Sequence, residues 1–182
     1  MLINLFSLPA LLLFAVAYGI TMKVADLLDE HGLRWFKGSA IIFGILWGIF
    51  GALLVLGDNT VANIILAMNV AFIVRNRLDF LNHKIAASII IIVFLFTTPF
   101  SSVIFAIFYI LFLFFGSLKD YMDDTVKKKG KLWLLTEIML YYPVSTFIYC
   151  LLYGSWLIFW VFLLYTIAYD LTKYVGYKYG YH

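Results

Sequence analysis

Seven long apolar segments separated by short polar ones constrain this chain more than any other feature. The apolar segments cover residues 2–22, 39–56, 61–74, 85–97, 103–116, 132–152 and 156–169. The chain is 65% hydrophobic and only 13% charged, whereas a soluble domain carries about 25% charged residues. Too little polar surface remains to cover a water-soluble globule. The sequence therefore predicts an all-α fold, a polytopic membrane bundle of about seven transmembrane helices.

Three local signals refine the expected helices. Pro99 interrupts the long apolar stretch 85–116, which as one helix would extend roughly 48 Å across a hydrocarbon core of about 30 Å; we therefore expect two short helices. Gly32 is a natural end for the first helix. Gly44 and Gly48 form a small-xxx-small pair suited to close helix packing. Pro143 is expected to bend the helix that contains it.

The basic residues predict the orientation of the bundle. All 13 Lys and Arg residues lie in the segments 22–38, 75–84 and 118–131 or in the C-terminal tail. The intervening turns carry none. Because basic segments stay on the cytoplasmic side, we expect a protein integral to the cell membrane with its charged segments and C-terminus in the cytoplasm and its N-terminus outside.

Two acidic segments mark the candidate site. In LKDYMDDTVKKKGK, Asp120, Asp123 and Asp124 stand at helical i, i+3 and i+4 positions and share one face. In KVADLLDEHGLRWFKG, Asp26 and Asp29 are three residues apart and Glu30 adjoins them. Basic residues follow both segments. Such a combination at the end of a membrane helix can hold a divalent cation and a phosphate together, although an isolated charge cluster is more often a solvated loop.

The spacing of these segments predicts an internal repeat. The two acidic motifs are 94 residues apart, and each is followed by a helix, a tight turn and another helix. We expect a single integral membrane domain, residues 1–182, made of two parallel three-helix repeats joined by a linker helix. Repeat one covers about residues 1–84, the linker helix 85–97, and repeat two about 102–182. Duplicated halves commonly enclose a site at their interface.

The paired motifs resemble those of the UbiA superfamily of intramembrane prenyltransferases. Lys119-Asp120-Tyr121-Met122-Asp123 is similar to the family motif KDxxD, and Asp26-x-x-Asp29 is similar to NDxxD. The chain departs from the family in having Ala25 where the first motif has Asn, and in lacking a third Asp after either motif. On this mapping the seven helices correspond to the second through eighth of the family's usual nine.

The resemblance implies a substrate, a cofactor and a set of site residues. Family members bind a prenyl diphosphate through Mg²⁺, ionise it and transfer the prenyl group to an acceptor. The residues implied as catalytic are Asp26, Asp29, Asp120 and Asp123. Together with Asp124 they are the implied metal ligands, and we expect the four catalytic aspartates to converge on one cavity. The residues implied to bind the diphosphate are Arg34, Lys37, Lys127 and Lys128.

Other functions stay open at this stage. Membrane lipids are the expected partners, with an isoprenoid diphosphate as the expected substrate and no nucleic acid. A small transporter or lipid carrier is one alternative, for which Asn63, Asn69 and Glu137 are the visible polar groups in apolar runs. A non-catalytic membrane subunit is another. His83 is a candidate ligand or acid–base group, although such a histidine is more often an interfacial polar residue.

Overall fold

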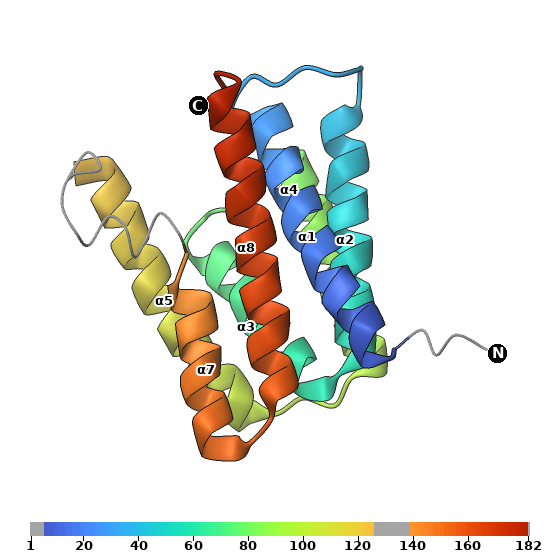
Figure 1. Cartoon of the computed structure of the whole chain (residues 1–182), viewed down its shortest axis with the longest axis vertical. Helices are drawn as coiled ribbons and strands as arrows, with labels where there is room; N and C mark the ends of the chain where they lie inside the picture. Colours follow the sequence, from blue (N-terminus) through green and yellow to red (C-terminus); the bar gives the residue numbers. More distant parts are fainter. Residues whose placement is uncertain (1–5, 126–138, 182) are drawn as a thin grey trace.

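The described part of the chain is entirely helical. The computed structural model describes the backbone of residues 6–125 and 139–181 and their side chains except those of 123–125. Its helices are α1 (Leu8–Asp29), α2 (Ser39–Gly57), α3 (Asn59–Val74), α4 (Leu81–Thr97), α5 (Ser102–Thr125), α7 (Tyr141–Tyr153) and α8 (Trp156–Lys178) (Figure 1). The prediction of an all-α fold is confirmed for these residues.

Four helices are long and apolar enough to cross a membrane. They are α1, α2, the segment Ser102–Met122 of α5, and α8, while α3 and α4 are apolar but shorter. A helix of 16 residues such as α3 extends only about 24 Å. The lengths and composition of the helices indicate association with a membrane. Among the described residues, four helices are candidates to cross it completely.

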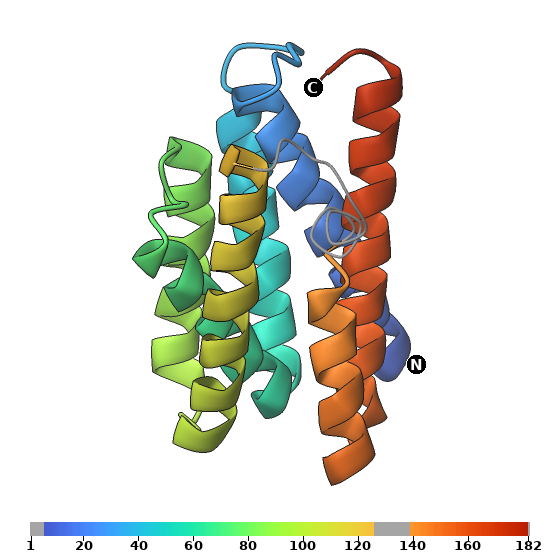
Figure 2. The same ribbon diagram turned by 90° about the vertical axis from the view of Figure 1, so that its left-hand side faces the viewer.

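Helices from the two ends of the chain pack side by side. α1 lies between α2 and α8, α4 packs on α2, α3 packs on α5, and α7 packs on α8. Following the contacts through α1, α2, α3, α5, α7 and α8 returns to α1 and closes a ring, with α4 against α2 on its outside (Figures 1 and 2). The N-terminal and C-terminal thirds therefore share one core.

Glycines on α2 bring α4 unusually close. A Cβ atom at Gly44 would lie 2.8 Å from the Cα atom of Asn82, and one at Gly48 would lie 2.8 Å from Cδ1 of Ile89. The pair thus packs as its spacing predicts. The consequence for the site is that the start of α4, including His83, is pressed against α2 and α1.

Connections between the helices lie at both ends of the bundle. The α1–α2 connection and the C-terminus lie at one end, and the α7–α8 turn lies at the other (Figure 1). At the latter end, Asn63 of α3 donates to the Pro99 carbonyl at 3.2 Å and accepts from the Ser101 N–H at 2.8 Å. These bonds tie the start of α3 to the turn between α4 and α5.

Several helices extend beyond the apolar segments that predicted them: α4 begins at Leu81 rather than at residue 85, and α5 continues to Thr125 rather than ending at 116. α1 continues past the apolar segment to Asp29, with Glu30 as its C-cap and Gly32 at φ 78°, so the first acidic motif is helical. α8 extends to Lys178. Pro143 does not bend the middle of a helix, because it lies in the first turn of α7, where no N–H is needed. Residues 132–138 of the expected sixth helix lie outside the described range.

Candidate functional site

A charged cavity of about 290 Å³ lies where the charged segments meet. Its walls include residues from all seven described helices or the segments next to them. The basic side chains that line it are Lys23, Arg75, Arg77, Lys119 and Lys173. The acidic ones are Asp26, Glu30, Asp79 and Asp120. A concave site with this density of both charges is the strongest candidate for function in the described part of the chain.

Asp26 is buried in this cavity and held by three side chains. It is 7% exposed. Its Oδ2 atom accepts a hydrogen bond from the Tyr169 hydroxyl at 2.9 Å, and the same atom lies 3.7 Å from the Lys23 ammonium. Its Oδ1 atom lies 3.1 Å from Nε2 of His83. A buried carboxylate needs such partners, because an isolated buried charge is costly.

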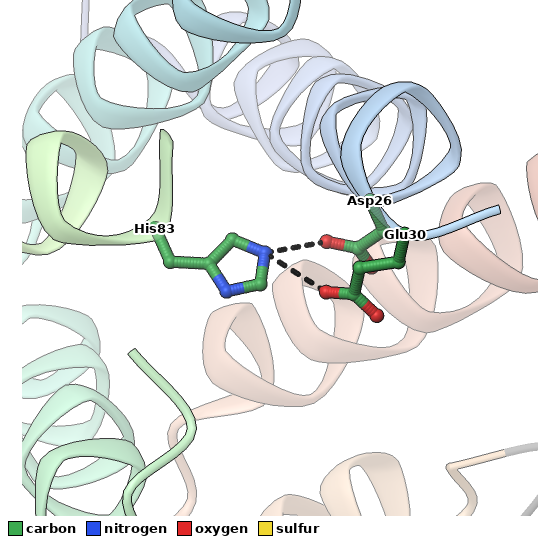
Figure 3. A group of neighbouring side chains, drawn as sticks. All are labelled: Asp26, Glu30 and His83. Carbon is green, nitrogen blue, oxygen red and sulfur yellow. Dashed lines mark hydrogen bonds and ion pairs between the residues drawn. The ribbon is translucent and has the colours of Figure 1, made fainter. Parts of the chain in front are cut away.

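Glu30 joins Asp26 and His83 at the end of α1. Its Oε1 atom lies 3.4 Å from Nε2 of His83, and Figure 3 shows the imidazole pointing at both carboxylates. One ligand atom from each of the three residues lies within 4.8 Å of the others, an arrangement that can hold a metal ion. Burial and then the negative charge of Asp26 raise the pKa of Glu30, against the opposing effects of His83 and Lys23.

Neighbouring groups fix the orientation of the His83 ring. Its Nδ1 atom lies 3.2 Å from the Arg77 carbonyl oxygen and 3.6 Å from Asp79 Oδ1. The rings of Trp47 and Phe80 contact the imidazole edge-on, with centroids 5.5 and 5.6 Å away. The side chain, which is 9% exposed, is therefore held by both packing and hydrogen bonds.

Asp120 meets two arginines on the α5 side of the cavity. Arg75 donates from Nε to Oδ2 at 2.9 Å and from Nη2 to Oδ1 at 2.8 Å, and Nη2 of Arg77 lies 2.6 Å from Oδ1. Gly116 precedes Asp120 by one turn, and a Cβ atom there would overlap the Arg75 guanidinium. The missing side chain thus lets Arg75 reach the carboxylate in a bidentate pair.

The structure brings together two of the predicted site residues. Asp26 and Asp120, one from each acidic motif, line the same cavity. Asp29 is exposed and lines a separate surface pocket together with Arg34 and Lys37. The reason is geometric: Glu30, four residues after Asp26, returns to the face of Asp26 more closely than Asp29 does, and α1 ends at Asp29. The side chains of Asp123 and Asp124, and all of Lys127 and Lys128, lie outside the described residues.

Several residues of the cavity have no place in the sequence-based site. The prediction from sequence includes four of these basic residues only through the topology or a motif: Arg75, Arg77, Lys119 and Lys173. Glu30 and Tyr169 were not assigned a role, and His83 was only a candidate. The usable signal was the i, i+4 spacing of Asp26 and Glu30, which places two carboxylates on one helix face.

As they stand, these side chains do not fit a Mg²⁺ shared between the two motifs. Asp120 is engaged by two guanidinium groups, and Asp29 lines a different pocket. The lining between and around the two motifs carries five basic side chains as well as Glu30 and Asp79. The shared magnesium stays a prediction from sequence.

An apolar groove adjoins the charged cavity. It has a volume of about 350 Å³ and lies between α5 and α7. Its lining residues include Phe108, Leu111, Phe115 and Ile148, and Tyr141 lines both the groove and the charged cavity. A polar hollow and an apolar one therefore meet at a single side chain.

Comparisons of this chain with known protein families, with characterised proteins and with solved structures gave no match.

Proposed function

We propose that this protein is an intramembrane transferase acting on a prenyl diphosphate or a related lipid phosphate. The observation that carries the proposal is the junction at Tyr141 between a charged cavity and an apolar groove. An amphiphile with an anionic head and an apolar chain matches both halves of this junction. In the proposed orientation the charged end of the bundle faces the cytoplasm, since it carries the basic residues.

The phosphate end would bind among the basic residues of the cavity. Arginine presents several N–H donors in a fixed fork that suits phosphate oxygens, and Arg77 is 45% exposed at its side chain. Lys119 and Lys173 add positive charge from α5 and α8. Asp120 already pairs with both arginines, so an incoming phosphate would compete with this carboxylate for their donors.

The prenyl chain would lie in the groove between α5 and α7. Ile107, Ile148 and Leu152 line it and are 39%, 53% and 74% exposed, so the groove opens toward the lipid if these helices span the membrane. An apolar chain in the groove would reach Tyr141, the side chain that also lines the charged cavity. The volume of about 350 Å³ is within the usual range for a small-molecule pocket.

The proposed reaction breaks the carbon–oxygen bond between the prenyl group and the diphosphate. The electron pair stays on the diphosphate, whose growing negative charge the arginines and lysines stabilise. The acceptor forms a bond to the same carbon and loses a proton. The stacked rings of Phe115 and Tyr141, with centroids 5.9 Å apart, supply π faces near the junction, and such faces favour an allylic cation.

The packing also supports the proposed repeat. If α1, α2 and α3 correspond to α5, α7 and α8, the contact of α1 with α8 corresponds to the contact of α5 with α3, and both are extensive, whereas the extensive contact of α1 with α2 has only a small counterpart between α5 and the described part of α7. α4 then acts as the linker. For a carrier, Asn63 bonds a turn and the Asn69 amide donates to the Ile65 carbonyl while its oxygen is buried without a partner; Glu137 lies outside the described residues.

A turnover assay tests the proposal. Purified protein in lipid nanodiscs is incubated with geranylgeranyl diphosphate and a membrane lipid extract, and released pyrophosphate and prenylated lipid are measured. We expect both products, with a marked loss in Lys119→Gln and little change in Lys37→Gln, a matched variant outside the cavity. Binding of the diphosphate without any product would leave a carrier as the function. Equal effects of the two substitutions would exclude the cavity as the site.

A further inference from the structure

We propose that Asp26, Glu30 and His83 form a binding site for a divalent transition-metal ion. The two carboxylates come from the end of α1 and the imidazole comes from the start of α4 (Figure 3). The site goes beyond the proposed transferase, because it would exist without any lipid. It also differs from the magnesium site implied by the sequence motifs, which includes Asp29 and Asp120 and lacks nitrogen.

The distances between the three ligand atoms suit a common metal ion. Nε2 of His83 lies 3.1 Å from Asp26 Oδ1 and 3.4 Å from Glu30 Oε1. Metal bonds of about 2.0–2.2 Å to nitrogen and oxygen place neighbouring ligand atoms roughly 3.0–3.5 Å apart. The two carboxylate oxygens lie within 4.8 Å of each other, so an ion would fit among the three atoms once these oxygens adopt the same spacing. The cavity beside them leaves room for water or a phosphate oxygen to complete the coordination.

The hydrogen bond on the far side of the imidazole points to the same conclusion. A backbone carbonyl can only accept, so the 3.2 Å contact with the Arg77 oxygen makes Nδ1 of His83 the donor. In the neutral ring the proton is then on Nδ1, and Nε2 presents a lone pair. That lone pair faces two carboxylates. A metal cation bound to that lone pair would take the place of the Nε2 proton between the ring and the two carboxylates.

The surrounding residues resemble the outer partners of a metal site. Metal-binding histidines nearly always donate their other ring N–H to a carbonyl or carboxylate, and metal-binding carboxylates are themselves hydrogen-bonded. Here the Arg77 carbonyl accepts from His83, and the Tyr169 hydroxyl donates to Oδ2 of Asp26, leaving Oδ1 for the ion. The rings of Trp47 and Phe80 restrain the imidazole.

The ligand types decide the class of metal. Imidazole nitrogen suits zinc, iron and similar ions, whereas Mg²⁺ prefers an all-oxygen octahedral set. For one mixed nitrogen and oxygen site, Zn²⁺ should bind more tightly than Mn²⁺, and Mg²⁺ should bind most weakly. The site is thus expected to select first-row transition metals.

Metal binding to the purified, chelator-treated protein tests the proposal directly. Titration calorimetry with Zn²⁺, Mn²⁺ and Mg²⁺ alone should give one Zn²⁺ per chain. His83→Gln and Asp26→Asn should each weaken Zn²⁺ by at least about tenfold, while Asp29→Asn, three residues from Asp26 but exposed, should leave it unchanged. Thermal unfolding of each variant checks that the bundle is intact.

Electron paramagnetic resonance gives a readout that does not depend on affinity. Bound Mn²⁺ should show nitrogen coupling from a histidine ligand, and the coupling should disappear in His83→Gln. Absence of Zn²⁺ and Mn²⁺ binding would overturn the proposal and leave His83 as an imidazolium that ties α1 to α4. An all-oxygen Mn²⁺ signal, or equal losses from Asp26→Asn and Asp29→Asn, would also overturn it. Since no lipid is present, this result is independent of the turnover assay.

Discussion

Two carboxylates in the charged cavity, those of Asp26 and Asp120, depend on charged or hydrogen-bonding partners. Asp26 is buried with partners drawn from α1, α4 and α8, and Asp120 is compensated by two arginines. If one partner of such a group is removed, the remaining charges stay buried without compensation, which costs free energy. Both carboxylates therefore give predictions that separate a structural role from a catalytic one.

Asp120→Asn tests what this carboxylate does. If it serves as the counter-charge of Arg75 and Arg77, its neutralisation leaves both guanidinium groups available to phosphate. We therefore expect tighter binding of inorganic pyrophosphate, by roughly three- to tenfold, at some loss of stability. Titration calorimetry measures it. Weaker binding, restored by raising Mg²⁺, would instead support the metal-ligand role implied by the sequence motif.

Tyr169→Phe tests the hydrogen bond by which α8 stabilises the Asp26 carboxylate. The substitution removes the hydroxyl that donates to Oδ2 at 2.9 Å but keeps the ring. A hydrogen bond to a buried charge contributes about 1.5–3 kcal/mol, so a lower thermal unfolding temperature in detergent is expected. The matched control is Tyr174→Phe, whose ring is 67% exposed on the same helix. Equal unfolding temperatures for the two variants would contradict the assigned bond.

At the scale of elements, the site depends on how closely α4 approaches α2. Gly44→Ala adds a Cβ atom that meets the backbone of Asn82 at 2.8 Å, so α4 must shift together with the adjacent His83. Overpacking of this kind costs about 1–3 kcal/mol. We expect reduced thermal stability and weaker Zn²⁺ binding. Ile45→Ala, at a 39% exposed position of α2, is the control, and wild-type metal binding in Gly44→Ala would be inconsistent with this geometry.

The whole molecule is expected to cross the membrane with its charged end in the cytoplasm. Lys37→Cys places a thiol at that end, and Phe100→Cys places one in the exposed turn at the other end. The native Cys150 is buried. In intact bacterial cells that express the protein, a membrane-impermeant maleimide should label position 100 and spare position 37 until the cells are lysed. Labelling of both positions in intact cells would contradict the topology.

The sequence predicted more of the bundle than of the site. The apolar segments locate α2 to α5, because a helix buried in a membrane is a run of apolar residues. Gly32 indicates the approximate end of α1. The pair of Arg75 and Asp120 joins residues 45 apart and depends on the packing of α3 on α5 and on the missing side chain of Gly116. Tyr169 and Asp26 are 143 residues apart. No local sequence pattern indicates contacts over such separations. The basic residues of the cavity therefore enter the prediction from sequence only through the topology and, for Lys119, through the KDxxD-like motif.

The charged cavity and its adjoining groove are proposed to bind a phosphate-bearing prenyl lipid. The test is to titrate the protein in nanodiscs with geranylgeranyl diphosphate and, separately, with geranylgeraniol. Binding is measured for the wild type, Arg77→Gln and Arg34→Gln. We expect at least about tenfold tighter binding of the diphosphate than of the alcohol, a loss of that preference in Arg77→Gln, and its retention in Arg34→Gln. Equal binding of the two lipids, or equal effects of the two substitutions, would contradict it.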